Sequence, residues 1–504
     1  MRQLLARLTP AALLAILAFA LVLVVTDPPG PGLDPDALSY MGAAQSLVAH
    51  GTYRIPTAPW SSADSTSPLA HFPPGYSTAL AIPMALGMAP PQAARLVDAL
   101  AAAVTVATLV LVVGTATTMF AGAALGAALI VMPAMATVHL SVLSEPLFLA
   151  LLALTLAAMV YAPDRPLRAG ITAALGAMVR YAGASLVAAV ALWAFARRTP
   201  VRERIRRAVI AALPAVVLEG VWVVRTRLAS GESHAIRHFA LYGKLGPTLR
   251  QGGSTLGDWL VPETDVEWPV PHRGLIALVA AVLLVVLIVL GARAARADTR
   301  GRAWRLLRAC ALLVACYAAM IGVSRLVADP AIPLDERILA PFLLLVTTAA
   351  VVAIACWWCA TRSRVARAAV GAAFAGWLVT SASVALDDGR FALDNGSDFA
   401  GEQWRYSPLL DWARTEGAAH PLYTNWPAAV YFHLHRTSYS LPTPDESGKL
   451  AKFVDTVRQR DGRVLVFDAP NADDPVARTM IEQAGLHVVA RFADGMALAP
   501  NAAE

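Results

Sequence analysis

Long apolar runs separated by short polar segments make up most of the chain. A helix of about 17 to 25 apolar residues crosses a bilayer, and runs of roughly this length occur at 10–26, 93–115, 118–138, 144–162, 205–224, 273–292, 304–326, 337–359 and 366–386. The run 167–196 is too long for one span and carries Arg180 and Gly183 near its middle, so we expect two short spans that meet at this break. The pattern predicts a polytopic α-helical membrane protein with about eleven transmembrane helices.

The pattern changes beyond Leu386, where acidic, aromatic and turn residues replace the alanine and valine runs. Short β-type segments are expected at 420–424, 463–468 and 487–499, and helical patterns lie at 406–417, 426–433, 446–460 and 474–484. We therefore divide the chain into a transmembrane module, 1–386, and a small soluble α/β domain, 387–504. We expect this domain to shape the entrance for a substrate without supplying the catalytic base.

Composition agrees with a lipid environment. Hydrophobic residues make up 57% of the 504 positions and charged residues only 15%, whereas soluble domains contain about 25% charged residues. The net charge of +6 comes from arginine-rich loops, and no interleaving of basic and aromatic residues indicates a nucleic-acid partner. The four cysteines lie in or beside apolar runs, so no disulfide framework is expected.

Arginine collects in the segments that connect alternate pairs of spans. The clusters are at 2–7, 165–168, 197–207, 293–308 and 362–367. Because arginine-rich loops stay in the cytoplasm, the segments 27–92, 139–144, 225–272, 327–336 and everything after 387 are expected outside. We predict a multi-pass protein of the bacterial inner or plasma membrane whose C-terminal domain is exterior.

Two apolar segments need separate interpretation. The N-terminal run resembles a signal peptide, but its end at 24–29 lacks a small-x-small cleavage site, so we interpret it as a retained span. The segment 77–90 is short and interrupted by Pro83. A full span there would move every arginine cluster to the other side, so we expect a helix that lies in the membrane interface.

Ionisable residues placed at the exterior ends of spans are candidates for function, because charges are costly at membrane depth. Asp36 and Tyr40 are one helical turn apart, Glu145 begins a span, Arg180 lies at the helix break, and Arg337 begins a late span. Each has a local structural explanation, as a cap, a helix-dipole partner or a snorkelling arginine. All of them nevertheless lie at the same predicted depth, the exterior face of the membrane, and this predicts a charged rim around an exterior cavity.

The order of several motifs resembles the polyprenyl-phosphate-sugar glycosyltransferases of the GT-C fold. Within them the chain is most similar to bacterial relatives of protein mannosyltransferases and of the lipid A aminoarabinose transferase, over roughly residues 1–390. The matching positions are Asp36, Tyr40, Ala44, Leu47 and Gly51, then Pro73 to Tyr76, then Ser144 to Phe148, and finally Arg337 and Pro341.

The resemblance implies a sugar carried on a polyprenyl phosphate and an envelope acceptor, which could be a lipid, a glycan or a protein. The family's first acidic position matches Asp36, with Asp34 as the less favoured neighbour, and its second matches Glu145. This chain has Asp34-Pro35-Asp36 where the protein mannosyltransferases have adjacent acids. The acceptor class is therefore not carried over.

The chemistry assigns roles to the same residues. Asp36 would deprotonate or orient the acceptor hydroxyl, and guanidinium groups would hold the leaving phosphate. The candidates for binding the donor phosphate or substrate are Tyr40, His71, Tyr76, Arg180, Arg337 and a subset of Arg237, His238 and Lys244. A divalent cation could share the phosphate with Asp36 and Glu145.

Two other classes of protein share part of this pattern. A transporter or a flippase for lipid-linked glycans also has many spans and buried charges, but it predicts internal repeats and charges near mid-membrane. A polysaccharide polymerase or ligase would place its large exterior loop late in the chain. Here the acidic motif follows the first span, which favours the glycosyltransferase.

Overall fold

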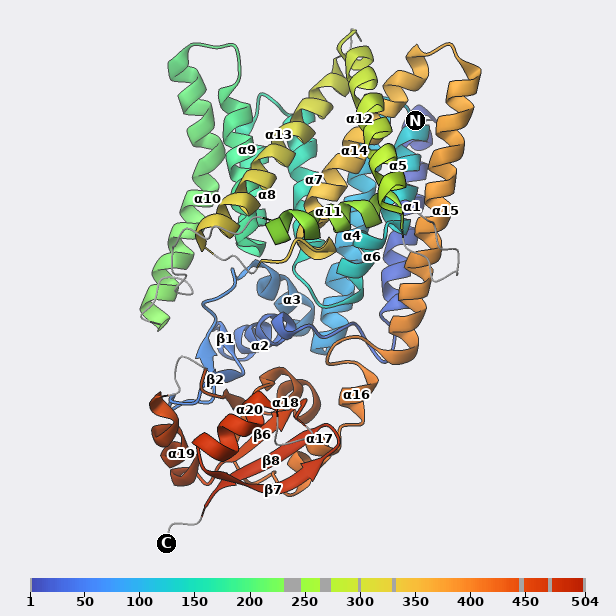
Figure 1. Cartoon of the computed structure of the whole chain (residues 1–504). Helices are drawn as coiled ribbons and strands as arrows, with labels where there is room; N and C mark the ends of the chain where they lie inside the picture. The colour runs from blue at the N-terminus through green and yellow to red at the C-terminus, as the bar shows by residue number, and fades with distance from the viewer. Residues whose placement is uncertain are drawn as a thin grey trace.

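The computed structural model describes residues 2–230, 246–262, 273–297, 301–328, 332–443, 448–469 and 474–501. A bundle of apolar helices forms one end of the molecule and a mixed sheet with its covering helices forms the other (Figure 1). The helices of the bundle are α1 (Arg2–Val25), α4 (Pro90–Ala116), α5 (Met119–Val131), α6 (Pro133–Leu140), α7 (Glu145–Tyr161), α8 (Pro166–Val179), α9 (Ala184–Phe195), α10 (Val201–Ser230), α12 (Arg273–Ala297), α13 (Arg302–Val323), α14 (Glu336–Ala360) and α15 (Arg364–Asn395).

The bundle confirms a multi-pass membrane protein. Seven helices of the described chain are long and apolar enough to cross a membrane, namely α1, α4, α10, α12, α13, α14 and α15. The apolar helices α5 and α6 meet at a 54° bend where Pro133 begins α6, a geometry typical of a broken span or a re-entrant loop. The apolar helices α7, α8 and α9 coincide with the remaining predicted spans but are shorter, so the count of eleven stays a prediction.

The expected break in the run 167–196 is present. Helix α8 ends at Val179, Arg180 is extended with φ −145° and ψ 138°, and a short 3-10 turn over Tyr181–Gly183 leads into α9. Gly183 is required there, because a Cβ atom would lie 2.4 Å from the backbone nitrogen of Ala177. The break turns the Arg180 side chain out of both helices.

The arginine-rich loops lie together at one end of the bundle. Arg197 forms an ion pair with Asp164, and Arg207 Nη2 donates to the carbonyl oxygen of Pro163 over 2.9 Å. Arg305 Nη1 likewise donates to the carbonyl of Val160 over 3.0 Å. The first long loop and the C-terminal domain lie at the opposite end (Figure 1).

The first long loop folds into helices and short strands. Its elements are α2 (Pro35–His50), β1 (Arg54–Ile55), β2 (Thr57–Pro59), β3 (Ser67–Pro68) and α3 (Gly75–Ala85). Helix α3 occupies the segment expected to lie in the interface, and it is only 11 residues long. In the next long loop, α11 (Gly246–Leu260) lies across the bundle (Figure 1).

The C-terminal region is a small α/β domain, as predicted from its composition. Its elements are α16 (Glu402–Arg405), α17 (Pro408–Thr415), β4 (Leu422–Thr424), α18 (Pro427–Leu434), β5 (Ser438–Ser440), α19 (Leu450–Gln459), β6 (Arg463–Phe467), α20 (Pro475–Arg478), β7 (Leu486–Phe492) and β8 (Gly495–Pro500). The segment expected as one strand at 487–499 is the hairpin β7–β8, whose turn ends at Gly495 with φ +154°.

The sheet joins the first long loop to the C-terminal domain. Its strand order is β2-β5-β4-β6-β8-β7, with β2, β5, β4 and β6 parallel and the last pairs antiparallel. Strand β2 comes from the first loop and pairs with β5.

Helix α15 continues to Asn395, so the boundary placed at 386 from composition falls inside this helix.

Candidate active site

Arg337 is the centre of a cluster of charges at the end of the bundle that faces the C-terminal domain. Its side chain leaves the first turn of α14, where Asp335 caps the helix by accepting from the backbone N–H of Ile338 over 2.9 Å. Arg337 Nη2 lies 2.5 Å from Asp36 Oδ2, and Nη1 lies 3.4 Å from Asp34 Oδ2. Its Nε donates to Glu145. One guanidinium thus contacts three carboxylates from two distant segments of the chain.

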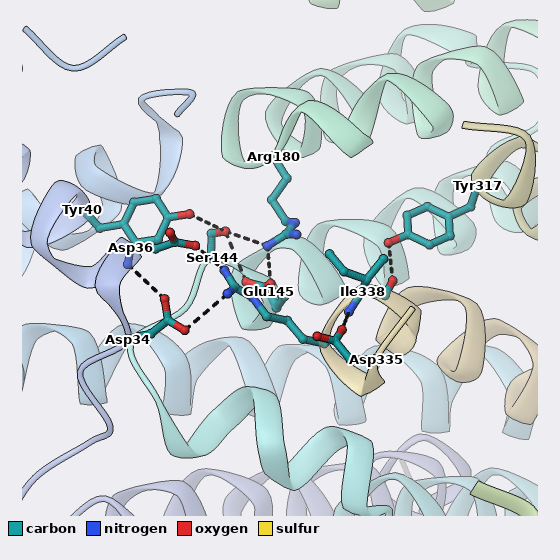
Figure 2. Close-up of polar contacts among 10 residues, drawn as sticks. Asp34, Asp36, Tyr40, Ser144, Glu145, Arg180, Tyr317, Asp335 and Ile338 are labelled. Atoms are coloured by element: carbon teal, nitrogen blue, oxygen red, sulfur yellow. Dashed lines mark hydrogen bonds and ion pairs between the residues drawn. The ribbon is translucent and has the colours of Figure 1, made fainter. Parts of the chain in front are cut away.

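Glu145 joins the two arginines of the cluster. It begins α7, its side chain is 1% exposed, and it forms ion pairs with both Arg180 and Arg337 (Figure 2). The side chain of Arg180 is 15% exposed and that of Arg337 is 24% exposed, so both still reach the space beyond Glu145. Glu145 therefore holds Arg180 and Arg337 side by side, with their remaining N–H groups available to another anion.

Ser144 connects the ion pairs to Tyr40. Its hydroxyl donates to Glu145 Oε2 over 3.3 Å and accepts from Arg180 Nη1 over 3.1 Å. Because a serine hydroxyl has one hydrogen, Tyr40, 3.2 Å away, is the donor in its bond with Ser144. Burial raises the pKa of Tyr40, so its phenol keeps its proton and remains a donor.

Helix α2 presents the two aspartates. Asp34 is its N-cap and accepts from the backbone N–H of Asp36 over 3.0 Å, while Pro35 occupies the first helical position. Burial raises the pKa of Asp34. Asp36 points to the arginines from the first turn and is 29% exposed, which makes it the most open carboxylate that contacts Arg337.

The Pro-Pro-Gly-Tyr segment packs behind Tyr40. Tyr76 is fully buried, meets the Tyr40 ring edge-on at 5.1 Å and donates to both carboxylate oxygens of Asp98, at 3.0 and 3.1 Å. Gly75 allows a close approach to α8, because a Cβ atom there would lie 2.6 Å from the carbonyl oxygen of Met178. The motif thus fixes the position of Tyr40 relative to the break at Arg180.

A cavity of about 470 Å³ opens beside these charges. Asp36, Tyr40, Arg180 and Arg337 form its polar side together with the exposed His71. The opposite side is largely apolar and comes from the end of α13 and the segment that precedes α14. The lining residues there include Tyr317, Met320, Ile321, Ser324, Ile332 and Pro333. The cavity can therefore hold a ligand with one anionic and one apolar part.

The structure brings together most of the residues expected at this site. Asp36, Tyr40, His71, Arg180 and Arg337 line the cavity, whereas Tyr76 lies behind Tyr40 and does not reach the cavity wall. Three further candidates, Arg237, His238 and Lys244, lie outside the described residues.

The carboxylates do not fit a cation bound jointly by Asp36 and Glu145. Both contact the Arg337 guanidinium, and buried Glu145 has a second guanidinium, that of Arg180, at its oxygens. A cation there would lie among positive charges. Across the described parts of the chain, no group of three His, Cys, Asp or Glu side chains is arranged to hold a metal ion. No step below depends on a metal.

One site residue has no signal in the sequence. Asp398 follows α15 and accepts from Ser141 Oγ over 3.2 Å, and burial raises its pKa, although the charge on Arg337 opposes this shift. The backbone of Leu33 pairs with 397–399, since Leu33 N–H donates to Ser397 and Phe399 N–H donates to Leu33, over 3.4 and 3.3 Å. The start of the C-terminal domain therefore supports the residue that precedes Asp34.

The C-terminal domain also contacts α2 directly. Tyr431 on α18 donates to the Gln45 side chain. Trp426 Nε1 donates to Asp468 over 2.8 Å, and His433 Nε2 contacts the carbonyl oxygen of Phe399 over 2.7 Å. Trp426 and His433 therefore have partners within the domain, which agrees with a packing role.

Comparisons with known proteins identify the fold. No protein-family model matches the chain, and no curated protein matches its sequence. Among solved structures, the oligosaccharyltransferase of Archaeoglobus fulgidus is similar with a TM-score of 0.50 and 10% identity, over 97% of this chain and 73% of that one. The arabinofuranosyltransferase AftD from Mycobacteria is similar with a TM-score of 0.51 and 17% identity, over 97% of this chain and 41% of that one. ArnT of Cupriavidus metallidurans is similar with a TM-score of 0.47 and 14% identity, over 96% of this chain and 97% of that one.

Proposed function

The chain has the GT-C fold, and we propose that it is a membrane glycosyltransferase that moves a sugar from a polyprenyl-phosphate carrier to a hydroxyl group of an envelope acceptor. The observation that carries the proposal is the cavity in which Asp36 lies beside the guanidiniums of Arg180 and Arg337. Glycosyl transfer needs a base for the acceptor and positive charge for the departing phosphate.

The form of the cavity supports a lipid-linked donor. Its arginine side would bind a phosphate by paired N–H groups. Its apolar side, with Met320 and Ile321 of α13, lies where the bundle meets the exterior segments and would accept the first isoprene units. A soluble nucleotide sugar would gain nothing from this apolar wall.

The ion pairs suggest how the base is exposed. Arg337 Nη2 contacts the Asp36 carboxylate, so a phosphate that takes over Nη2 would release this carboxylate toward the acceptor. Glu145 would keep both arginines in place during this exchange because it contacts each of them. The base would therefore become available when the donor is bound.

In the proposed reaction the acceptor hydroxyl oxygen attacks the anomeric carbon of the sugar. The bond between that carbon and the phosphate oxygen breaks, and the hydroxyl proton passes to Asp36. The polyprenyl phosphate leaves with one more negative charge on its oxygens, and the guanidinium groups of Arg180 and Arg337 stabilise this charge. Atoms and charge balance without a further reactant.

The arginine-rich loops support an exterior site, because they lie at the end of the bundle opposite the first long loop and the C-terminal domain (Figure 1). We propose that the first loop and the C-terminal domain face the periplasmic or extracellular side of a bacterial cell membrane.

The position of the charges argues against a transporter. Glu145 and Arg337 occupy first turns of helices and Arg180 a helix break, all at one end of the bundle, whereas a transporter would place its charges near mid-membrane.

The test compares two neighbouring aspartates in the purified full-length protein. We expect Asp36→Asn to reduce transfer by about 10²- to 10⁴-fold, the contribution of a general base. Asp34→Asn is the matched control, since asparagine also caps a helix, and it should lose less than about tenfold, because the base is untouched. The assay measures polyprenyl phosphate released from radiolabelled polyprenyl-phosphate hexoses and pentoses when an envelope extract is the acceptor.

Two results would refute the proposal. One is wild-type transfer by Asp36→Asn protein that is inserted and folded. The other is a wild-type protein that consumes none of the polyprenyl-phosphate sugars but moves a fluorescent lipid-linked glycan across vesicle membranes, which would identify a flippase. Mass spectrometry of envelope glycans from a deletion strain then identifies the sugar and the acceptor.

A further inference from the structure

Helix α11 lies across the bundle (Figure 1), and its C-terminal end is attached to other helices. Trp259 Nε1 donates to the sulfur of Met132 over 3.2 Å, at the bend between α5 and α6. The indole N–H of Trp377 on α15 donates to the carbonyl oxygen of Trp259 over 2.9 Å. These contacts fix the position of α11 relative to the bundle.

The polar face of α11 holds one residue outside it, Leu334, by its backbone. Gln251 and Thr255 are four positions apart and therefore lie on the same face of the helix. Gln251 Oε1 accepts from the backbone N–H of Leu334 over 3.0 Å, and Thr255 Oγ1 donates to the carbonyl oxygen of Leu334 over 2.7 Å. Both backbone polar groups of Leu334 are therefore bonded to side chains of α11.

The surroundings of Thr255 favour its bond with Leu334. A threonine hydroxyl has one hydrogen, and the other nearby acceptor, the carbonyl oxygen of Gln251, is farther away at 3.2 Å. The Thr255 residue is 7% exposed, so its bond is shielded from water. Gly252 adds a close contact, because a Cβ atom there would lie 3.0 Å from Leu334 Cδ1. Leu334 thus meets α11 with its N–H, its carbonyl and its side chain.

Leu334 lies between the apolar wall of the active-site cavity and the charged cluster. Ile332 and Pro333 precede it and form part of the apolar wall, whereas Asp335 follows it and caps α14. Within the part of the chain that the structure describes, every hydrogen bond of the segment 332–334 is made with α11. The order of this part of the wall therefore depends on α11.

The charged cluster has anchors of its own. Arg337 forms ion pairs with Asp36 and Glu145. The Tyr317 hydroxyl donates to the carbonyl oxygen of Ile338 over 2.7 Å (Figure 2). These contacts hold the first turn of α14 without help from α11. Loss of the contacts at Leu334 would therefore loosen the apolar wall and leave the charges in place.

We propose that Gln251 and Thr255 are positioning residues that fix the apolar wall at 332–333 for the prenyl chain of the donor. Neither residue lines the cavity, so each acts through Leu334. A wall that has to be ordered when the ligand binds costs backbone entropy, which weakens binding by about tenfold for each residue ordered. The inference rests on the proposed function, because that function supplies the prenyl phosphate.

The first test measures the Kd of farnesyl phosphate, a prenyl phosphate without a sugar, for full-length protein in nanodiscs. Thr255→Val keeps the shape of the side chain and removes the hydroxyl, so the Kd should rise about tenfold. Thr255→Ser keeps the hydroxyl and should bind like the wild-type protein. Ser254→Ala is the matched control. It removes an exposed hydroxyl of α11 that, among the described residues, forms no hydrogen bond with Leu334.

Two further measurements separate positioning from a general loss of structure. Hydrogen exchange without ligand should be about tenfold faster at the Leu334 amide of Thr255→Val, the factor for one lost hydrogen bond, and unchanged in Ser254→Ala. In the transfer assay the KM of Thr255→Val for the donor should rise with the Kd. Its kcat should stay unchanged, because Asp36 and Arg337 keep their contacts, whereas misfolding would lower kcat.

Equal affinity of wild-type and Thr255→Val protein for farnesyl phosphate would overturn the inference, as would a wild-type protein that binds none. Gln251→Leu is the second variant, because Gln251 is exposed and its replacement leaves the packing of α11 intact. Its Kd should rise in the same way, and an unchanged value would also overturn the inference. A wild-type protein that binds farnesyl phosphate but transfers no sugar would instead refute only the proposed function.

Discussion

Replacing Glu145 by glutamine tests whether the two arginines depend on one buried carboxylate. Glutamine has the same shape but no charge, so Arg180 and Arg337 would lose their shared partner and repel each other. Removing one member of a buried ion pair costs about 3–5 kcal/mol. Both guanidiniums are partly exposed and keep Ser144 or Asp36 as partners, so we expect a loss of about 3 kcal/mol, at the lower end of that range.

Unfolding by SDS in mixed micelles, followed by circular dichroism, measures this loss on the purified full-length protein. Glu336→Gln is the matched control, because Glu336 also lies in the first turn of a helix but, within the described residues, accepts only from the neutral Thr137 hydroxyl, over 2.9 Å. Its loss should stay below about 1 kcal/mol, the usual contribution of a first-turn carboxylate. If the two variants lose equal stability, Glu145 does not hold the arginines together, and our account of the site is wrong.

Three further predictions concern the phosphate site, the orientation and the C-terminal domain. Arg337→Lys keeps the charge but not the forked geometry, so the KM for the donor should rise by about 10- to 100-fold, the factor for one charge-assisted hydrogen bond. An unchanged KM would remove the phosphate role from Arg337. Reporter fusions should place residues 200, 298 and 363 in the cytoplasm and residue 250 and the C-terminus outside, and a cytoplasmic C-terminus would contradict the orientation. Truncation after Asn395 removes β5, the partner of β2, and the 397–399 segment that pairs with Leu33. The truncated protein should still insert, but limited proteolysis should cut its 51–70 segment faster than in the full chain, and transfer to the acceptor should weaken. An uncut loop would show that the domain does not order it.

The apolar pattern alone determined the helix bundle. Lipid offers no hydrogen-bond partner to the backbone, so a long apolar run in a membrane must satisfy its own groups as a helix. This local rule explains why the predicted runs coincide with α1, α4 and the other bundle helices. The break at Arg180 was also visible, because an arginine and a glycine interrupt a run too long for one span.

The candidate site was predicted in part. The sequence alone places Asp36, Glu145 and Arg337 near the ends of predicted spans, which is a property of the local sequence. That one guanidinium contacts Asp34, Asp36 and Glu145 was not predictable, since no local pattern records a pairing between positions 192 to 303 residues apart. The burial of Tyr76 against Asp98 likewise depends on how α3 packs on α4.

The C-terminal domain shows the same division. Its five-residue strand β6 and its helices follow from sequence patterns, whereas β2 and β5 have three residues each and carry too little periodicity to predict. Only tertiary structure decided that β2 of the first loop completes the C-terminal sheet, and that Asp398 and Leu33 meet beside the charged cluster. The sequence by itself determined which segments enter the membrane, because burial in lipid is a property of each segment alone. Contacts between segments decided the sheet, the charge cluster and the cavity beside that cluster, because each of these needs atoms from parts of the chain that only folding brings together.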